Sequence, residues 1–256
     1  MVESIKEKKK ILIIHGWLHS AERYFALSER LSKFADVDIY EFEGFGRKKF
    51  RYKTLNILGY YVEKLQNYLK EKKYDIVITH SMGGNVLLKV LSRSNFKFNY
   101  IILSNTAYHG LPVLKPIVWM LPITILSLWI TKVIPKRLIK PILRKISLLT
   151  IQDPKYFDEI MFKDVLRCNA VVAAITIFQL SYDKFKFVPK TQNNKIKFIL
   201  TYSEKDRVIP FRNTQELMND LRFPIVKEFK NIGHTVVLEA QDYYYQMIKE
   251  IIDREA

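Results

Sequence analysis

Short apolar runs alternate with segments of helical periodicity through the first hundred residues, and this alternation restricts the possible folds more than any other feature. The apolar runs occupy residues 11–14, 37–40, 76–79 and 100–103. The helical segments between them cover residues 21–34, 55–72 and 82–91. Apolar runs of this length, each followed by a helix, are typical of parallel strands buried on both faces. The pattern therefore predicts an α/β fold, in which one mainly parallel sheet carries helices on both faces.

The same alternation returns near the end of the chain. Two further strands are expected, at residues 196–201 and 225–229. Each is followed by a segment with helical periodicity, near residues 213–221 and 243–252. The predicted sheet therefore contains about six strands.

Residues 111–189 separate the two parts of the predicted sheet and differ from both. They are rich in apolar and basic residues, and repeated prolines divide them into stretches that suit short helices but not parallel strands. Both ends of this segment adjoin predicted strands of one sheet. We therefore predict a core of residues 1–110 and 190–256 that contains the sheet, into which residues 111–189 are inserted as a helical cap.

The composition is that of a globular protein, with 48% hydrophobic and 27% charged residues in a chain of 256. Cys168 is the only cysteine, so no internal disulfide can form and a cytoplasmic location is expected. The apolar run at residues 11–14 is too short for a secretion signal. Residues 117–131 carry no charge. At about 1.5 Å per helical residue they do not span a hydrocarbon layer of about 30 Å, so a buried or membrane-surface segment is expected.

A formal net charge of +16 favours association with an anionic partner. Between residues 111 and 150 there are seven lysines and arginines and no acidic residue. Four of the basic residues recur at every fourth position, namely Lys132, Lys136, Lys140 and Arg144. They would form one cationic stripe if the prolines only kink a continuous helix, and such a stripe favours peripheral contact with an anionic membrane. A solvated lysine-rich surface is the alternative, and without a nucleic-acid-binding motif no nucleic acid is expected as a partner.

A serine lies at the turn between the third predicted strand and the helix that follows it. The local sequence is Thr79-His80-Ser81-Met82-Gly83-Gly84. A strand, a sharp turn and a helix are the context in which a G-x-S-x-G motif exposes a nucleophilic serine, and the small glycines let the backbone fold back on itself. Thr79 stands in place of the first glycine of that motif. Ser81 is therefore a candidate nucleophile, and the alternative is a serine that only caps the helix.

An acid and a histidine follow the last two predicted strands. Asp206 lies in the loop after the fifth strand, and His234 lies in the loop after the sixth. A His-Gly-Trp segment follows the first strand, at residues 15–17. With the order serine, acid, histidine, each on a loop after a strand, the chain resembles the α/β-hydrolase superfamily over residues 9–110 and 195–256.

The resemblance implies that Ser81 attacks a carbonyl carbon, His234 acts as general base and Asp206 orients the histidine. Glu204 is the alternative acid. The position at which some members of the superfamily carry the acid reads Ser104-Asn105-Thr106 here and has no carboxylate.

The resemblance also implies an oxyanion hole formed by the backbone N–H groups of Trp17 and Met82. His19 and His109 are expected to line the pocket or lie at its rim. No cofactor or metal is implied, because no pair of histidines has the spacing of metal ligands on a helix with a carboxylate partner. The residues expected to support the motif loops are His15, Gly16, His80, Gly83 and Gly84.

The sequence thus predicts a serine hydrolase that cleaves carboxylic esters through an acyl-enzyme, similar to carboxylesterases, monoacylglycerol lipases and lysophospholipases. The apolar and basic character of the cap favours medium or long acyl chains. Two alternatives stay open. One is a thioesterase or acyltransferase with the same triad, and the other is a non-catalytic α/β-hydrolase-like module that binds an apolar ligand or a membrane.

Overall fold

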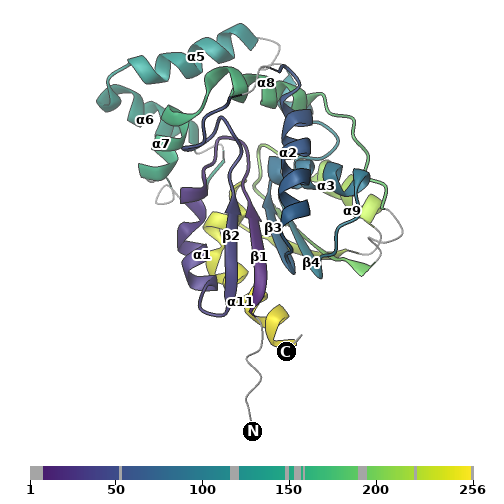
Figure 1. The fold of residues 1–256 in the computed structure, drawn as a ribbon. Coiled ribbons are helices and arrows are strands. Elements are labelled where there is room, and N and C mark those ends of the chain that lie inside the picture. Colours follow the sequence, from purple (N-terminus) through teal and green to yellow (C-terminus); the bar gives the residue numbers. More distant parts are fainter. Residues whose placement is uncertain are drawn as a thin grey trace.

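The computed structural model describes residues 8–51, 54–115, 121–147, 150–152, 157, 159–189, 195–221 and 224–254 (Figure 1). Six strands form one sheet with the spatial order β2-β1-β3-β4-β5-β6, and every neighbouring pair is parallel. The strands are β1 (Lys9–Ile14), β2 (Ala35–Tyr40), β3 (Ile76–His80), β4 (Tyr100–Ser104), β5 (Lys197–Ser203) and β6 (Ile225–Phe229). The predicted α/β fold, with a parallel sheet of about six strands, is confirmed.

Helices cover both faces of the sheet, because successive side chains of a strand point to opposite faces. Leu12 and Ile14 of β1 belong to the cluster that includes α2 and α3, whereas Ile11 and Ile13 belong to the cluster that includes α1 and α11. Figure 1 accordingly shows α1 and α11 on one side of the sheet and α2 and α3 on the other. The helices of the core are η1 (Ala21–Tyr24), α1 (Phe25–Leu31), α2 (Ile57–Glu71), α3 (Met82–Arg93), α9 (Phe211–Leu221), α10 (Val236–Glu239) and α11 (Gln241–Arg254).

One helix is predicted over residues 21–34, but the observed α-helix in this segment is shorter and begins later. A 3₁₀ turn, η1, precedes α1, and α1 ends at Leu31. Long-range contacts hold the first turn: the Arg23 Nε donates to Asp164 Oδ2 at 2.5 Å, and the Ser20 backbone N–H donates to the same oxygen at 3.2 Å. Both side chains of this ion pair are almost fully buried. Periodicity does not reveal such contacts, because Asp164 lies far along the chain.

The segment between β4 and β5 contains helices, and within its described residues no strand occurs. Figure 1 shows α5 to α8 together beyond the carboxyl ends of the strands. Among the described helices, none is both long and apolar enough to cross a bilayer. The first residues of the uncharged run at 117–131, Trp119 among them, lie outside the described residues. The helices of this segment are η2 (Pro112–Leu114), α5 (Leu121–Val133), α6 (Lys136–Ser147), α7 (Glu159–Arg167) and α8 (Ala170–Ser181).

The cationic residues expected on one continuous helix are divided between two helices. Lys132 belongs to α5, whose last residue is Val133, whereas the other three belong to α6. Pro135 separates the two helices, because a proline lacks the N–H that a helix interior requires but suits the residues just before a helix. Its carbonyl accepts the N–H of Leu138 at 2.9 Å. The condition for one unbroken stripe therefore fails at Pro135, whereas Pro141 does lie inside α6.

Candidate active site

The structure brings together the three side chains that the sequence singled out. The distance from His234 Nε2 to Ser81 Oγ is 3.0 Å, and the distance from His234 Nδ1 to Asp206 Oδ2 is 2.7 Å. Ser81 follows β3, Asp206 follows β5 and His234 follows β6. The carboxyl ends of parallel strands meet at one edge of the sheet, so residues far apart in the chain can form one hydrogen-bonded series there.

The backbone of Ser81 has the strained turn geometry that a nucleophile after a strand requires. Its φ is +51° and its ψ is −114°, a region that L residues rarely adopt and that persists only where the surroundings enforce it. Two hydrogen bonds hold it. The Ser81 N–H donates to the Ser104 carbonyl at 2.9 Å, and the Ser81 carbonyl accepts the Ala107 N–H at 3.2 Å.

Close packing explains why a glycine follows this turn. A Cβ on Gly83 would lie 2.6 Å from the carbonyl oxygen of Ile14, so only glycine fits between α3 and β1. Thr79, in contrast, fits where the motif usually has glycine, because its hydroxyl donates to the Ile102 carbonyl at 3.1 Å within the sheet. The departure from the G-x-S-x-G pattern therefore leaves the turn intact.

Two backbone donors fix the orientation of the Asp206 carboxylate. Its Oδ1 accepts the N–H groups of Val208 and Ile209 at 2.8 and 2.9 Å, which leaves Oδ2 for the histidine. The side chain is only 3% exposed. Glu204 is exposed on the same loop, and its backbone N–H pairs with Phe229. Asp206, not Glu204, therefore contacts His234.

Asn105, immediately after β4, holds the histidine loop in place. Its Nδ2 donates to the His234 carbonyl at 2.7 Å and also contacts Ser203 Oγ at 3.0 Å, and the side chain is buried. Sequence reasoning tested this position only for a carboxylate and missed the amide. Its φ of +41° lies in the left-handed region, which asparagine tolerates better than most residues. We therefore regard Asn105 as a positioning residue.

Replacing Asn105 with aspartate should lower kcat about tenfold, because the isosteric carboxylate keeps the backbone conformation but cannot donate to the buried His234 carbonyl. The melting temperature should fall as well. The expected signature is a loss in kcat with little change in KM, measured with a soluble ester. Asn67→Asp, at an exposed position on α2, is the matched control and should leave kcat unchanged. Equal kcat in the two variants would contradict a positioning role.

The loop after β1 lies directly against Ser81. A Cβ on Gly16 would approach Ser81 Cβ to 3.2 Å and His80 Cδ2 to 2.9 Å. The next residue, Trp17, donates its indole N–H to the Ala173 carbonyl of α8 at 2.8 Å. Met82, the first residue of α3, is fully buried. This loop thus connects Ser81 to α8, and it is the loop expected to supply one donor of the oxyanion hole.

His15 links the loop after β1 to the loop after β2. Its Nε2 accepts the N–H of Phe42 at 3.0 Å, so the proton is on Nδ1, which donates to the Gly16 carbonyl at 2.7 Å. Burial lowers the pKa of His15 to about 4. The imidazole is therefore neutral and structural.

Two further buried histidines stack beside the triad. The His80 ring lies 4.8 Å from the ring of His234 and 4.8 Å from the ring of His19. The Nδ1 of His19 pairs with the Tyr24 hydroxyl at 2.9 Å. Burial lowers the pKa values of His19 and His80 well below the ordinary histidine range. Among the described residues, no group of three or more potential ligands is arranged to hold a metal ion.

The three buried neutral histidines, His15, His19 and His80, should make stability depend on pH. Their folded-state pKa values lie below 6.5, so below about pH 6.5 the unfolded chain binds more protons than the folded chain. The free energy of unfolding should therefore fall as the pH falls, and His15, with a folded-state pKa of about 4, should contribute about 2 kcal/mol of this loss at about pH 5. Thermal unfolding at about pH 7 and about pH 5 measures this. An unchanged melting temperature would contradict the prediction.

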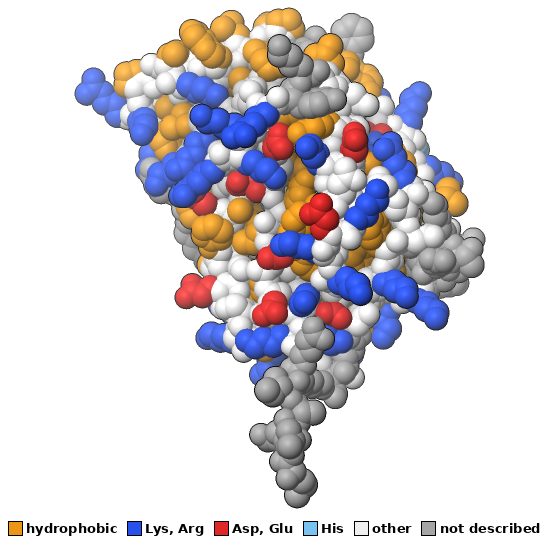
Figure 2. All heavy atoms as spheres, in the orientation of Figure 1, with side chains coloured by type: hydrophobic (Ala, Val, Ile, Leu, Met, Phe, Trp, Pro, Cys, Tyr) orange, Lys and Arg blue, Asp and Glu red, His pale blue; other side chains and the backbone are white. Residues whose placement is uncertain are grey.

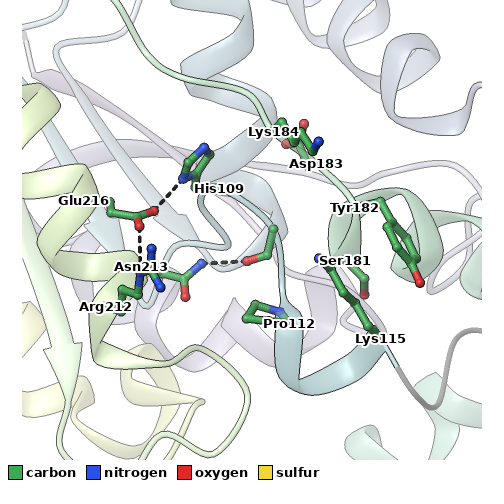
Figure 3. A pocket seen from close by; sticks show the side chains of 11 residues that line it. His109, Pro112, Lys115, Ser181, Tyr182, Asp183, Lys184, Arg212, Asn213 and Glu216 are labelled. Carbon is green, nitrogen blue, oxygen red and sulfur yellow. Dashed lines mark hydrogen bonds and ion pairs between the residues drawn. The ribbon is translucent and has the colours of Figure 1, made fainter.

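A cavity of about 350 Å³ opens between the loop after β4, the end of α8 and the start of α9 (Figure 3). Basic side chains line it, including His109, Lys115 and Arg212, and no triad residue does. Glu216 pairs with both His109, at 2.6 Å, and Arg212, at 2.9 Å. His109 thus lies at this cavity and not beside the nucleophile.

The fold and the arrangement of Ser81, His234 and Asp206 are those of an α/β-hydrolase. Residues 5–241 match the sequence profile of the family described as "serine aminopeptidase, S33", and the chain belongs to this family of α/β-hydrolases. No match was found among curated proteins.

Solved structures with the same fold include several hydrolases. An esterase from Exiguobacterium antarcticum superposes with a TM-score of 0.73 at 13% identity, over 96% of this chain and 92% of that chain. A carboxylesterase structure from the thaumarchaeon Nitrososphaera gargenis gives 0.72 at 16% identity, over 96% and 90%. MenH from S. aureus gives 0.71 at 15% identity, over 98% and 96%. At these identities the likeness establishes the fold alone.

Proposed function

We propose that this chain is a serine hydrolase that cleaves carboxylic esters through an acyl-enzyme, with Ser81 as nucleophile, His234 as general base and Asp206 as the orienting acid. The observation that carries the proposal is the continuous hydrogen-bonded series from Asp206 through His234 to Ser81. Proximity of this kind lets a weakly nucleophilic hydroxyl react, because a base removes its proton during attack.

The proposed reaction has two matched steps. His234 Nε2 takes the Ser81 hydroxyl proton while Oγ bonds to the ester carbonyl carbon, and the same proton then passes to the departing alcohol as the C–O bond breaks. Water repeats the sequence on the acyl-enzyme, which releases the acid and restores Ser81. Asp206 accepts the Nδ1–H of His234 throughout, keeps the tautomer correct and stabilises the imidazolium.

The proposed oxyanion hole uses the backbone N–H groups of Met82 and Trp17. Met82 begins α3, whose N-terminal end carries partial positive charge that favours an anion. The segment before Trp17 lies against Ser81. Loss of one such donor typically costs about 3–4 kcal/mol of transition-state stabilisation.

An apolar environment next to the triad supports medium or long acyl chains as substrates. The cap helix α8 packs Val172, Ala173 and Ile177 into the same apolar cluster as Met82 and Phe45. Ser81 and His234 are each only 6% exposed. Each methylene that enters apolar surroundings adds about 0.8 kcal/mol of binding, so chains longer than about six carbons should react faster than acetate.

Labelling with a fluorophosphonate probe separates an enzyme from a non-catalytic binding module. Such probes phosphonylate a serine only where its hydroxyl is activated. The wild-type chain should be labelled and Ser81→Ala should not be. An unlabelled wild-type chain of native melting temperature would reject the catalytic proposal and favour the module that only binds an apolar ligand or a membrane.

A panel of substrates then defines the leaving group and chain length. p-Nitrophenyl esters of increasing length, an acyl thioester and an aminoacyl arylamide can be compared by kcat/KM. We expect the esters to be cleaved fastest, with the maximum at medium or long chains. The highest kcat/KM for the thioester would favour the thioesterase alternative. The highest kcat/KM for the arylamide would favour the peptidase activity that the family description names. A maximum at acetate would exclude a preference for lipid esters.

A further inference from the structure

Two consecutive helices of the cap carry large apolar side chains that face solvent. On α5 they are Ile123, Leu126, Trp129 and Val133, and on α6 they are Leu138, Ile142 and Ile146. Each of these side chains is more than half exposed. Spacings of three or four residues place each set on one side of its helix. Single exposed apolar residues are ordinary, but two helical rows in succession indicate an interaction surface.

The exposed row on α6 is separate from the apolar row that α6 uses for its own packing. Ile139 and Leu143 are buried and pack with Phe162 of α7. The row of Leu138, Ile142 and Ile146 is displaced around the helix from these two residues. The apolar face of α6 is therefore wider than its contact with the rest of the chain requires.

Positive charge borders the exposed rows. Arg137, Arg144 and Lys145 on α6 are exposed, and no acidic residue occurs between residues 111 and 150. At 100° per residue, Lys145 lies next to Leu138 on the side away from the buried row, and Arg137 and Arg144 lie further around the helix on that same side. Figure 2 shows hydrophobic side chains along the upper edge of the molecule, where Figure 1 places α5, with blue Lys and Arg side chains beside and below them.

We propose that the exposed rows of α5 and α6, together with Arg137, Arg144 and Lys145, form a docking surface for a bilayer that contains anionic lipid. The apolar side chains would enter the interface while the guanidinium and ammonium groups meet lipid phosphates. Charge favours this occupant over a second copy of the chain, because two such surfaces facing each other would bring like charges together.

Docking itself does not depend on the proposed catalysis. If the proposed function also holds, the surface would bring the cap against the membrane and give the buried triad access to acyl esters of the lipid phase. Binding should therefore be unchanged in Ser81→Ala, and the two proposals can fail separately.

Vesicle binding tests the proposal. The full-length chain should co-sediment with phosphatidylcholine vesicles in which about one third of the lipid is phosphatidylglycerol, and at least about tenfold less with pure phosphatidylcholine. High salt should weaken binding. The fluorescence emission of Trp129 should shift to shorter wavelength when the chain binds the anionic vesicles. This shift should be absent in Trp129→Phe.

Matched variants locate the surface. The apolar variant carries Leu138→Ser, Ile142→Ser and Ile146→Ser, and its control carries the equally exposed Phe25→Ser, Leu55→Ser and Ile225→Ser. The charge variant carries Arg137→Glu, Arg144→Glu and Lys145→Glu, and its control carries Lys33→Glu, Lys73→Glu and Lys249→Glu. Each docking-surface variant should lose at least about tenfold in vesicle affinity, and each control should keep it.

Three results would overturn the proposal. The first is a wild-type chain that fails to bind the anionic vesicles. The second is an equal loss of vesicle affinity in the surface variants and their controls, because net charge or general hydrophobicity would then explain binding without a defined surface. The third is concentration-dependent self-association in gel filtration that the apolar variant abolishes, because the occupant would then be a second copy. Circular dichroism of each variant confirms that it is folded.

Discussion

Replacing Ser81 with alanine should lower kcat for a soluble aryl ester by about 10⁵–10⁶-fold, because the proposed acyl-enzyme forms on the Ser81 hydroxyl. The neighbouring contacts are made by the backbone of residue 81, which donates to Ser104 and accepts from Ala107. Alanine keeps both hydrogen bonds. The melting temperature should therefore change by only about 2 °C, and steady-state kinetics together with thermal unfolding measure the two effects.

Ser92→Ala is a matched control on the helix that follows the nucleophile. The Ser92 hydroxyl bonds only to the Leu88 carbonyl of its own helix among the hydrogen bonds of the described residues, so its loss should leave kcat within about twofold. Substantial ester cleavage by Ser81→Ala, with wild-type kcat in Ser92→Ala, would show that the reaction does not pass through Ser81.

Replacing Asp206 with asparagine should lower kcat by up to about 10⁴-fold while leaving the loop in place. The backbone N–H groups of Val208 and Ile209 hold Oδ1, so they should hold the oxygen of the new amide as well. The amide nitrogen then faces His234 Nδ1 and donates to it. This places the histidine proton on Nε2, which can no longer accept the hydroxyl proton of Ser81.

Glu204→Gln on the same loop distinguishes the two candidate acids. Glu204 is exposed and its side chain does not contact His234 in the described structure, so kcat should stay within about twofold of wild type. A large loss in Glu204→Gln with little loss in Asp206→Asn would assign the orienting role to the glutamate and show that the observed hydrogen bond is not the one used in turnover.

Elements that depend on local periodicity and on backbone chemistry can be predicted from the amino-acid sequence. The apolar runs predict the six strands, and the helical segments between them predict that the strands are parallel. The turn at Ser81 can be predicted because a strand, a turn with small residues and a helix follow one another directly in the sequence. Asp206 and His234 can be predicted as the candidate acid and base because each follows a strand. The carboxyl ends of parallel strands lie at one edge of a sheet.

Features that depend on contacts between distant segments become visible only in the folded structure. It places Asp206 and not Glu204 against His234, because backbone donors two and three residues later orient one carboxylate. It assigns Asn105 to the histidine loop, and it ends α5 before Pro135. Which apolar residues of α6 are buried and which face solvent also depends on where α7 packs. Periodicity along one segment carries no information about these partners, because each partner is supplied by another part of the chain.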